Sequence, residues 1–325
     1  MFLLAGASCA PTTRGNMEGA LRIDGSSTVY PFMEAVAEEY VKTHPRVRLT
    51  VGVSGTGGGF QRFCRGETDI NSASRPIHES EVECARRHGV EFIELPVALD
   101  GITLAVNPSN DFVDHLTVEE LHAIWAPDSV VRFWSDVRPT WPREEVILYG
   151  PGADSGTFDY FTEAVNGKSG RCRSDFTASE DDNVLVRGVE GDRSALGFFG
   201  FAYYQENRQR VRALAVDAGQ GPVLPSDQSI RQGSYRPLSR PLFVYVNIQS
   251  TRKREVRQFI DFMLDNAEPL AREVGFVPLS RDTYKLVDQR FSRRSPNSLF
   301  ARRNLQEQGV ANILRQDLDG RERNP

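Results

Sequence analysis

Residues 23–31 read Ile-Asp-Gly-Ser-Ser-Thr-Val-Tyr-Pro and join a strand pattern to a helix pattern. The strand is the short apolar run that ends at Ile23, and Gly25 opens a turn of small hydroxyl residues. Pro31 suits the first turn of a helix, where its missing N–H breaks no hydrogen bond. Apolar side chains then recur at helical spacing from Met33 to Val41. The stretch therefore predicts a strand, a glycine-containing turn and a helix in direct succession.

The same arrangement recurs twice along the chain. Ser-Gly-Thr-Gly-Gly-Gly at residues 54–59 follows a strand pattern at 47–53, and Asp-Ser-Gly-Thr at residues 154–157 follows a strand pattern at 146–149. Strand patterns that alternate with helix patterns predict α/β domains with mostly parallel sheets. A chain of 325 residues is long enough for two such domains.

Composition narrows the class of protein. Hydrophobic residues make up 39% and charged residues 26%, which is typical of a globular protein. The formal net charge of −5 argues against a broad nucleic-acid-binding face. A mildly acidic protein that binds an anion must do so through local geometry, because its overall field does not attract the ligand.

Each of the three turns would expose backbone N–H groups at the start of a helix, where the partial positive charge of the helix favours anions. Glycine lets the backbone approach a ligand closely, and serine and threonine add hydroxyl donors. One such turn is typical of ordinary helix capping. Three of them in the same context predict a convergent site for a tetrahedral oxyanion.

Charged side chains beside the turns would complete such a site. Arg75 lies near the end of a third strand-to-turn passage, at residues 69–76, and would add a permanently charged fork of donors. Phosphate near neutral pH carries a proton and needs an acceptor, whereas sulfate carries none. Asp154 is our candidate acceptor and Asp69 is the alternative. Asp154 can equally orient Arg75 through an ion pair or cap the helix that follows, and the sequence leaves these three roles open.

Patterns of catalysis and metal binding are missing from the sequence. The five histidines show no metal-ligand spacing, and neither the Gly-x-Ser-x-Gly motif nor the phosphate-binding P-loop occurs at a strand-turn-helix site. The acidic run Glu180-Asp181-Asp182 is typical of a solvated loop or a helix start. We therefore expect no enzyme activity, no metal and no cofactor.

Four motifs in this order, at residues 23–31, 55–60, 73–76 and 154–158, resemble the phosphate-binding protein of the high-affinity phosphate ABC transporter. The resemblance implies an α/β, type II periplasmic-binding-protein fold. In that fold two α/β domains with mostly parallel sheets are joined by a two-segment hinge, and the ligand lies in the cleft between them. Domain I would comprise residues 20–103 and 242–292, domain II residues 104–241, and a C-terminal extension residues 293–325.

The resemblance also implies a ligand and its contacts. The protein would bind inorganic phosphate on the extracytoplasmic side of the membrane and deliver it to the permease of an ABC importer, acting as a monomer with no nucleic-acid partner. The best studied members carry Asp where Arg75 stands and Arg where this chain has Pro151, so the residue that accepts the phosphate proton stays open. The residues expected at the ligand are Ser26, Ser27, Thr28, Ser54, Gly55, Thr56, Arg75, Asp154, Ser155, Gly156 and Thr157.

The first residues and the cysteines bear on export. Residues 1–19 begin with an apolar run around Cys9, which resembles the end of a secretory signal and the site where bacterial lipoproteins are lipidated. Lipidation of Cys9 and a plain secretory signal both stay open. In an exported protein Cys64 and Cys84 are candidates for a disulfide that closes a loop of about 20 residues. The alternative is a pair of reduced cysteines, and Cys172 is left unpaired in either case.

Three other functions are compatible with the motifs. A lipoprotein that senses phosphate without feeding a transporter would use the same cleft. A binding protein for another tetrahedral oxyanion, such as sulfate, molybdate or tungstate, would need similar donors. A phosphatase would also hold phosphate, but the sequence shows neither a nucleophile with its base nor a set of metal ligands.

Overall fold

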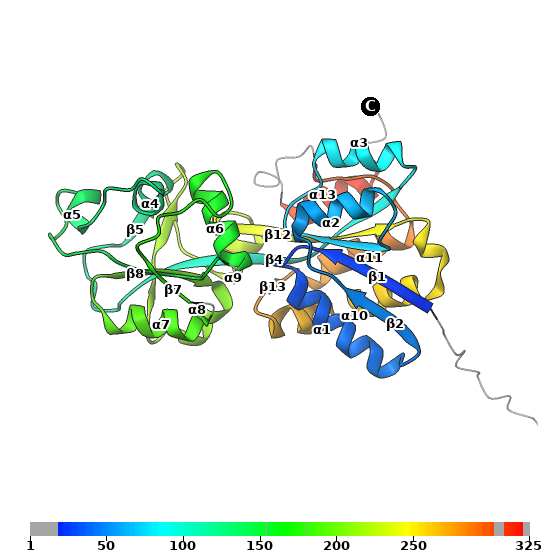
Figure 1. The fold of residues 1–325 in the computed structure, drawn as a ribbon, viewed down its shortest axis with the longest axis horizontal. Coiled ribbons are helices and arrows are strands. Elements are labelled where there is room, and N and C mark those ends of the chain that lie inside the picture. The colour runs from blue at the N-terminus through cyan, green and yellow to red at the C-terminus, as the bar shows by residue number, and fades with distance from the viewer. Residues whose placement is uncertain (1–18, 154, 180, 302–308, 321–325) are drawn as a thin grey trace, which may run out of the picture.

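The structure is a computed structural model that describes residues 19–153, 155–179, 181–301 and 309–320. Figure 1 shows two lobes side by side, joined by long strands that run from one to the other. The described strands are β1 (Gly19–Gly25), β2 (Val47–Val51), β3 (Ile70–Ala73), β4 (Phe92–Val106), β5 (His115–Thr117), β6 (Ile147–Gly150), β7 (Thr177–Ala178), β8 (Ala195–Gly200), β9 (Arg212–Ala213), β10 (Ala215–Asp217), β11 (Pro222–Val223), β12 (Ser239–Asn247) and β13 (Val277–Pro278).

Helices pack against the strands of each lobe. The described helices are α1 (Tyr30–Thr43), α2 (Gly55–Cys64), α3 (Glu79–Arg87), α4 (Val118–Trp125), α5 (Trp134–Val137), α6 (Gly156–Asn166), α7 (Asp182–Gly191), α8 (Phe201–Asn207), α9 (Asp227–Arg231), the 3₁₀ helix Ser250–Arg252, α10 (Arg254–Glu273), α11 (Arg281–Ser292) and α13 (Val310–Leu318). We call the lobe that holds β1, β2, β3, α1 and α10 lobe I, and the lobe that holds β6, β8, α4 and α6 lobe II (Figure 1).

The main sheet runs through both lobes in the order β2-β1-β3-β12-β4-β8-β6-β7, and β9 and β13 also pair with β4. The outer strands pair in parallel, β1 with β2 and β3 in lobe I and β6 with β7 and β8 in lobe II. The long strands β4 and β12 pair antiparallel with each other and connect the two halves. All fifteen residues of β4 are buried, as expected for a strand covered on both faces.

The local sequence signals account for the helix starts. Pro31 lies in the first turn of α1, as its position in the sequence predicted. A capping box begins α4, because the Thr117 hydroxyl accepts from the Glu120 N–H at 3.1 Å and the Glu120 carboxylate accepts from the Thr117 N–H at 2.9 Å. Apolar residues at helical spacing between Val256 and Leu264 form part of the buried face of α10.

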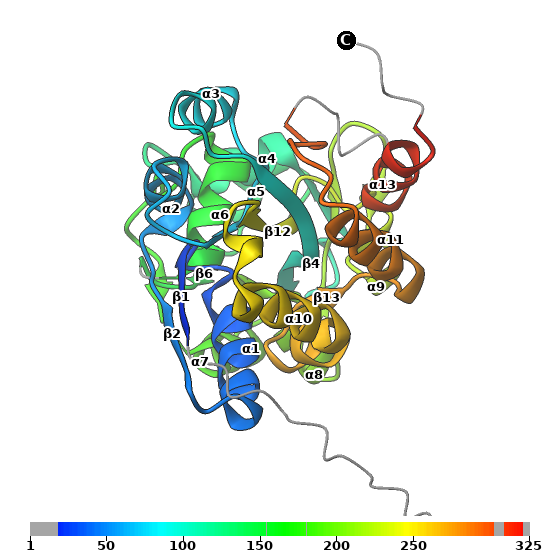
Figure 2. The same ribbon diagram turned by 90° about the vertical axis from the view of Figure 1, so that its right-hand side faces the viewer.

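The segment after α11 is built into lobe I. Figure 2 shows α11 and α13 side by side on one flank of this lobe, with α2 and α3 on the opposite flank. Phe300 is buried, with its ring centroid 5.2 Å from that of Phe243 on β12. Arg290 of α11 is fully buried and donates to Asp317 of α13 at 2.6 Å. These contacts make the described part of the C-terminal segment a structural element of the lobe.

The carboxylate of Glu94, on β4, anchors this segment. One oxygen accepts from the hydroxyls of Tyr245 and Ser298, each at 2.7 Å, and the other accepts from the N–H groups of Leu299 at 2.6 Å and Phe300 at 3.1 Å. Burial raises the pKa of Glu94, and these four donors act against that rise. The buried Glu94 carboxylate therefore joins the crossing strands β4 and β12 to residues 298–300.

Replacing Glu94 by Ala should lower the free energy of unfolding by about 3 kcal/mol, because the substitution leaves buried donors without an acceptor. Urea unfolding followed by circular dichroism measures the loss. Glu91→Ala is the matched control, since the Glu91 side chain is exposed. The control should stay within about 0.5 kcal/mol of the unsubstituted chain. Equal losses in the two variants would show that Glu94 is not an anchor.

Candidate functional site

A cavity of about 240 Å³ lies where the two lobes meet, and we call it the cleft. Lobe I lines it with the turn after β1, the start of α2 and the end of β3. Lobe II lines it with α6 and the loop that follows. The crossing strand β12 adds one arginine. The lining residues are Ser26, Ser27, Thr28, Gly55, Thr56, Gly57, Ser74, Arg75, Asp159, Tyr160, Glu163, Ser169 and Arg240.

The turn after β1 is tied to its neighbours by backbone hydrogen bonds. The Ser26 N–H donates to the Ser72 carbonyl at 3.0 Å, and the Ser26 carbonyl accepts from the Tyr30 N–H at 3.0 Å. Gly25 has a φ of +140°, and a Cβ there would lie 2.1 Å from the Ser72 carbonyl oxygen. Only glycine fits this position, so the backbone of Ser27 and Thr28 is held at the mouth of α1.

The start of α2 is fixed to the end of β3. The hydroxyls of Thr56 and Ser74 lie 3.1 Å apart, and the Ser74 N–H donates to the Thr56 hydroxyl at 3.3 Å. Gly55 adopts a φ of +72°, the left-handed region that favours glycine. Two of the predicted turns therefore face one cavity with fixed geometry, and each stands at a helix N-terminus that favours an anion.

Ser54 lies next to this turn but not among the cleft residues. Its N–H and hydroxyl donate to the Asp24 carboxylate at 3.0 Å and 2.8 Å, and Arg62 donates to the same group at 2.5 Å. Burial raises the pKa of Asp24, but the hydrogen bonds from Arg62, Ser54 and Gly25 outweigh burial and hold that pKa below its ordinary value. Asp24 therefore links the first two turns through Ser54, and the predicted ligand contact of Ser54 stays a prediction.

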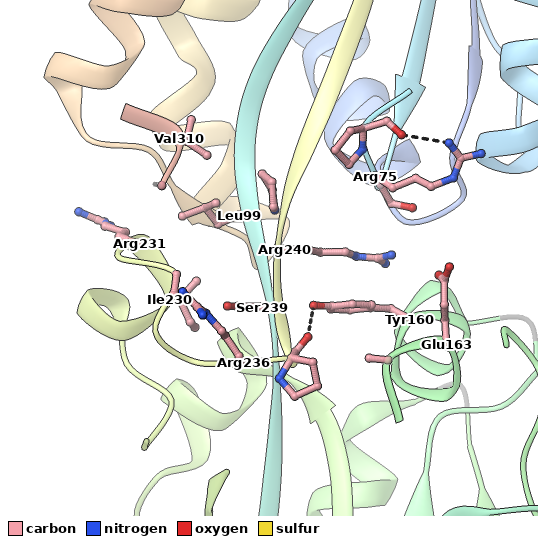
Figure 3. Close-up of a pocket in the computed structure, with 17 residues that line it drawn as sticks. Arg75, Leu99, Tyr160, Glu163, Ile230, Arg231, Arg236, Ser239, Arg240 and Val310 are labelled. Atoms are coloured by element: carbon pink, nitrogen blue, oxygen red, sulfur yellow. Dashed lines mark hydrogen bonds between the residues drawn. The ribbon is translucent and has the colours of Figure 1, made fainter. Parts of the chain in front are cut away.

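Arg75 lines the cleft, but its guanidinium is already paired. Its two terminal nitrogens donate to the Glu81 carboxylate at 2.9 Å and 2.8 Å, and one of them also donates to the Pro76 carbonyl, as Figure 3 shows. The Glu81 carboxylate further accepts from the His78 N–H at 2.8 Å, which caps α3. The Arg75 guanidinium, which the sequence predicted as a ligand contact, is therefore paired with the Glu81 carboxylate of the same lobe.

The two predicted proton acceptors have different outcomes. Asp154 lies outside the described residues. Asp69 is buried away from the cleft, where its carboxylate accepts from Ser250 and Lys253 at 2.7 Å each. Burial raises the pKa of Asp69, but the bonds from Lys253, Ser250 and the Arg22 N–H lower it further than burial raises it. The described carboxylates that line the cleft are instead those of Asp159 and Glu163.

Arg240, on β12, is the cleft residue that the sequence analysis missed. Its guanidinium lies 3.7 Å from the centroid of the Tyr160 ring, donates to the Thr28 hydroxyl at 3.2 Å, and approaches the Asp100 carboxylate to 3.5 Å. Figure 3 shows Arg240 and Tyr160 side by side, to the right of the crossing strands. Burial raises the pKa of Asp100, although Arg240 opposes that rise. Arg240 touches lobe I, lobe II and the crossing strands.

The third predicted turn meets the first. The Ser155 hydroxyl accepts from the Thr157 N–H at 3.2 Å and caps α6. A Cβ placed on Gly156 would lie 2.4 Å from the Thr28 hydroxyl oxygen, so the start of α6 rests on the turn after β1. Ser155, Gly156 and Thr157 are not among the residues that line the cleft. Their helix start nevertheless brings the two lobes into contact beside it.

The cysteine predictions have a separate outcome. Cys64, Cys84 and Cys172 are free thiols, so the predicted disulfide between Cys64 and Cys84 is not formed in this structure. The Cys64 thiol instead donates to the Glu81 carbonyl at 3.1 Å. Burial, with the neighbouring Cys84, raises the pKa of Cys64 to about 12. Cys9 lies outside the described residues.

Metal and membrane sites were sought in the same part of the chain. Among residues 19–153, 155–179, 181–301 and 309–320, no group of three His, Cys, Asp or Glu side chains is arranged to hold a metal ion. Within these ranges no helix has the length and apolar character needed to span a membrane.

Comparison with known proteins gives the family. Residues 10–267 match the model of the PBP superfamily domain. The protein SphX of Synechococcus elongatus is 48% identical over 313 residues, which cover 95% of this chain and 92% of SphX. The phosphate-binding protein PstS of Staphylococcus saprophyticus is 38% identical over 272 residues, which cover 83% of each chain.

A solved structure agrees with this result. The crystal structure of a possible phosphate binding protein from Planctomyces limnophilus matches with a TM-score of 0.82 at 44% identity and covers 86% of this chain and 99% of its own. The fold and the matches place the chain in the PBP superfamily. Within that superfamily the chain belongs to the family of the protein SphX and the phosphate-binding protein PstS. The predicted resemblance and fold class are confirmed.

The contact between Gly156 and Thr28 provides a test of the cleft. Gly156→Ala should weaken binding of inorganic phosphate by about tenfold, because the added methyl group collides with Thr28 and costs about 1–3 kcal/mol in the state where the lobes touch. Isothermal titration calorimetry measures the affinity. Gly191→Ala is the matched control, since a Cβ there has no neighbour within 4 Å. Unchanged phosphate affinity in Gly156→Ala would contradict a role for this contact.

Proposed function

We propose that this chain binds inorganic phosphate outside the cytoplasm and delivers it to an ABC importer by closure of its two lobes around the ion. The observation that carries the proposal is the convergence of two glycine-containing turns and Arg240 on one cavity, beside the start of α6. The names of the relatives support the ligand, because PstS is called a phosphate-binding protein.

The proposed site supplies many fixed donors to a small dianion. Residues just before α1 and at the start of α2 line the cleft, and we assign their backbone N–H groups to the ligand because the helix ends favour negative charge. The Thr28 hydroxyl accepts from Arg240, so its own proton is available for a ligand oxygen. Because Arg75 is neutralised by Glu81, Arg240 is the cation that we assign to the ligand.

A carboxylate in the cleft would distinguish phosphate from sulfate. Hydrogen phosphate can donate its proton to a carboxylate, whereas sulfate has no proton and meets only repulsion. Asp159 and Glu163 line the cleft and come from α6 of lobe II. We propose these two residues as acceptors beside the predicted Asp154, and Asp159 is already oriented by the Ser169 hydroxyl at 2.5 Å.

The domains predicted from the sequence would serve as the moving parts. We propose residues 20–103 with 242–292 as domain I and residues 104–241 as domain II, with β4 and β12 as the hinge. Arg240 lies on this hinge and contacts both Thr28 and Tyr160, so ligand binding and closure share one residue. Phosphate would shift the equilibrium toward the closed form in proportion to its tighter binding there.

The remaining parts of the proposal concern the protein's setting. The PBP superfamily match and the PstS name support a binding protein in place of an enzyme. We propose that the protein is a monomer outside the cytoplasm. A lipid on Cys9 would anchor it to the outer face of the membrane, whereas a plain secretory signal would release it without an anchor. A phosphate sensor that does not feed a permease, or a binder of another tetrahedral oxyanion, is the competing function.

Equilibrium dialysis with labelled phosphate against a hundredfold excess of sulfate tests the ligand. We expect phosphate to remain bound. Arg240→Gln should weaken phosphate binding by about ten- to a hundredfold, because a hydrogen bond to a charged group contributes about 1.5–3 kcal/mol. Arg208→Gln is the matched control, since it removes the same charge from an exposed position. Equal competition by sulfate would defeat the phosphate assignment.

A further inference from the structure

Two thiols of lobe I lie next to each other where α2 packs on α3. Cys64 is the last residue of α2, and Cys84 lies within α3. The Cys64 thiol donates to the Glu81 carbonyl of α3 at 3.1 Å, so its sulfur rests on that helix. Figure 2 shows α2 and α3 side by side on one flank of the lobe. Both cysteines are free thiols in this structure, which therefore represents the reduced form of the pair.

The two thiols differ in their access to solvent. Cys64 is 1% exposed, and burial, followed by the charge and hydrogen bond of Cys84, raises its pKa to about 12. Cys84 is only half-buried. The Nδ1 of His88 lies 3.9 Å from the Cys84 sulfur and donates to the Cys84 carbonyl at 2.8 Å, so this nitrogen carries a proton. An N–H group beside a sulfur stabilises the negative charge of an attacking thiolate. Cys84 is therefore the thiol that meets a reagent from solvent, and Cys64 lies behind it.

The chain between the two cysteines carries part of the cleft wall. It contains β3 and then Ser74 and Arg75, which line the cleft. Arg75 is paired with Glu81 inside the same segment. A bond between Cys64 and Cys84 would close this segment into a loop of about 20 residues and would restrict the unfolded chain. Such a bond would hold one wall of the cleft without occupying any group that faces it.

Cys172 is placed apart from this pair. It follows α6 in lobe II, where the N–H of the adjoining Arg173 donates to the Trp125 carbonyl at 3.2 Å. Burial raises the pKa of the Cys172 thiol to about 11. Among the described cysteines, Cys64 and Cys84 are therefore the two that the fold brings together.

We propose that Cys64 and Cys84 are a site of oxidative modification, where a disulfide forms and links α2 to α3. The Cys84 sulfur attacks a small-molecule disulfide such as oxidised glutathione, bonds to one of its sulfurs and expels the other half as a thiol. The Cys64 sulfur then attacks the Cys84 sulfur and expels the second half, which takes the Cys64 proton. The two protein thiols lose two electrons and two protons, and one glutathione disulfide is reduced to two thiols. An oxidising compartment outside the cytoplasm favours this direction of exchange.

Peptide mapping of the full chain tests the inference. The chain is incubated with oxidised glutathione, the remaining thiols are alkylated, and the digested peptides are identified by mass spectrometry. We expect one linked pair of peptides, from Cys64 and Cys84, that has lost two hydrogen atoms, together with alkylated Cys172. The oxidised chain should also unfold at a urea concentration roughly 0.5–1 M higher than the same chain after reduction, since the closed loop restricts the unfolded state.

Serine variants test the order of reaction. Cys64→Ser keeps a hydroxyl donor for the Glu81 carbonyl and should leave a glutathione adduct on Cys84. Cys84→Ser should leave Cys64 without an adduct, because the buried thiol does not meet the reagent. Cys172→Ser is the matched control, and it should keep both the linked pair and the urea shift.

The outcomes separate this inference from the proposed function. Alkyl groups on both Cys64 and Cys84 after oxidation, or a linked pair that includes Cys9 or Cys172, would overturn the inference. An adduct on Cys64 in the Cys84→Ser variant would overturn the assigned order of attack. Failure of the chain to bind inorganic phosphate would overturn the proposed function alone, because the mapping uses no phosphate.

Discussion

An oxyanion leaves water only where protein donors replace its hydration shell, and this requirement shapes the cleft. Turns line this cleft, and the position of their backbone groups does not depend on a side-chain rotamer. Gly25 allows its turn to lie against the Ser72 carbonyl, and the Asp24 carboxylate ties this turn to Ser54 at the next one. The Thr56 hydroxyl then joins the second turn to the third strand. The donors are therefore fixed before any ligand arrives, so binding does not have to pay for ordering them.

The crossing strands β4 and β12 join the lobes, and β12 also places the charge of Arg240 at the cleft. Arg75 and Glu81 neutralise each other within lobe I, which leaves a polar wall with little net field. Arg240 is only loosely paired with Asp100, and it stacks on Tyr160 of the opposite lobe. An arginine on this connecting strand contacts both lobes, and in the proposed function it also binds the ligand. The same strand pair carries Glu94, whose carboxylate binds the C-terminal segment, so hinge, cleft and chain end form one connected structure.

Local signals in the sequence predicted the parts of the site that local chemistry determines. Glycine and hydroxyl residues between a strand and a helix placed Thr28 and Thr56 at the cleft, and the start of α1 followed from Pro31. Contacts between residues that tertiary structure brings together could not be predicted in this way. Nothing near Arg75 in the sequence shows that Glu81, rather than a ligand, would take its guanidinium. Arg240 stands in a strand without any turn motif, and its role appears only when β12 is paired with β4.

The central claim is that turns far apart in the chain surround a single phosphate ion. A crystal structure of the chain grown with phosphate tests this claim most directly. We predict density for one ion bonded to the backbone of the turn at Ser27 and Thr28, to the start of α2 at Thr56, and to Arg240. Density for phosphate on an outer face, with these groups still bonded only to one another, would contradict the account.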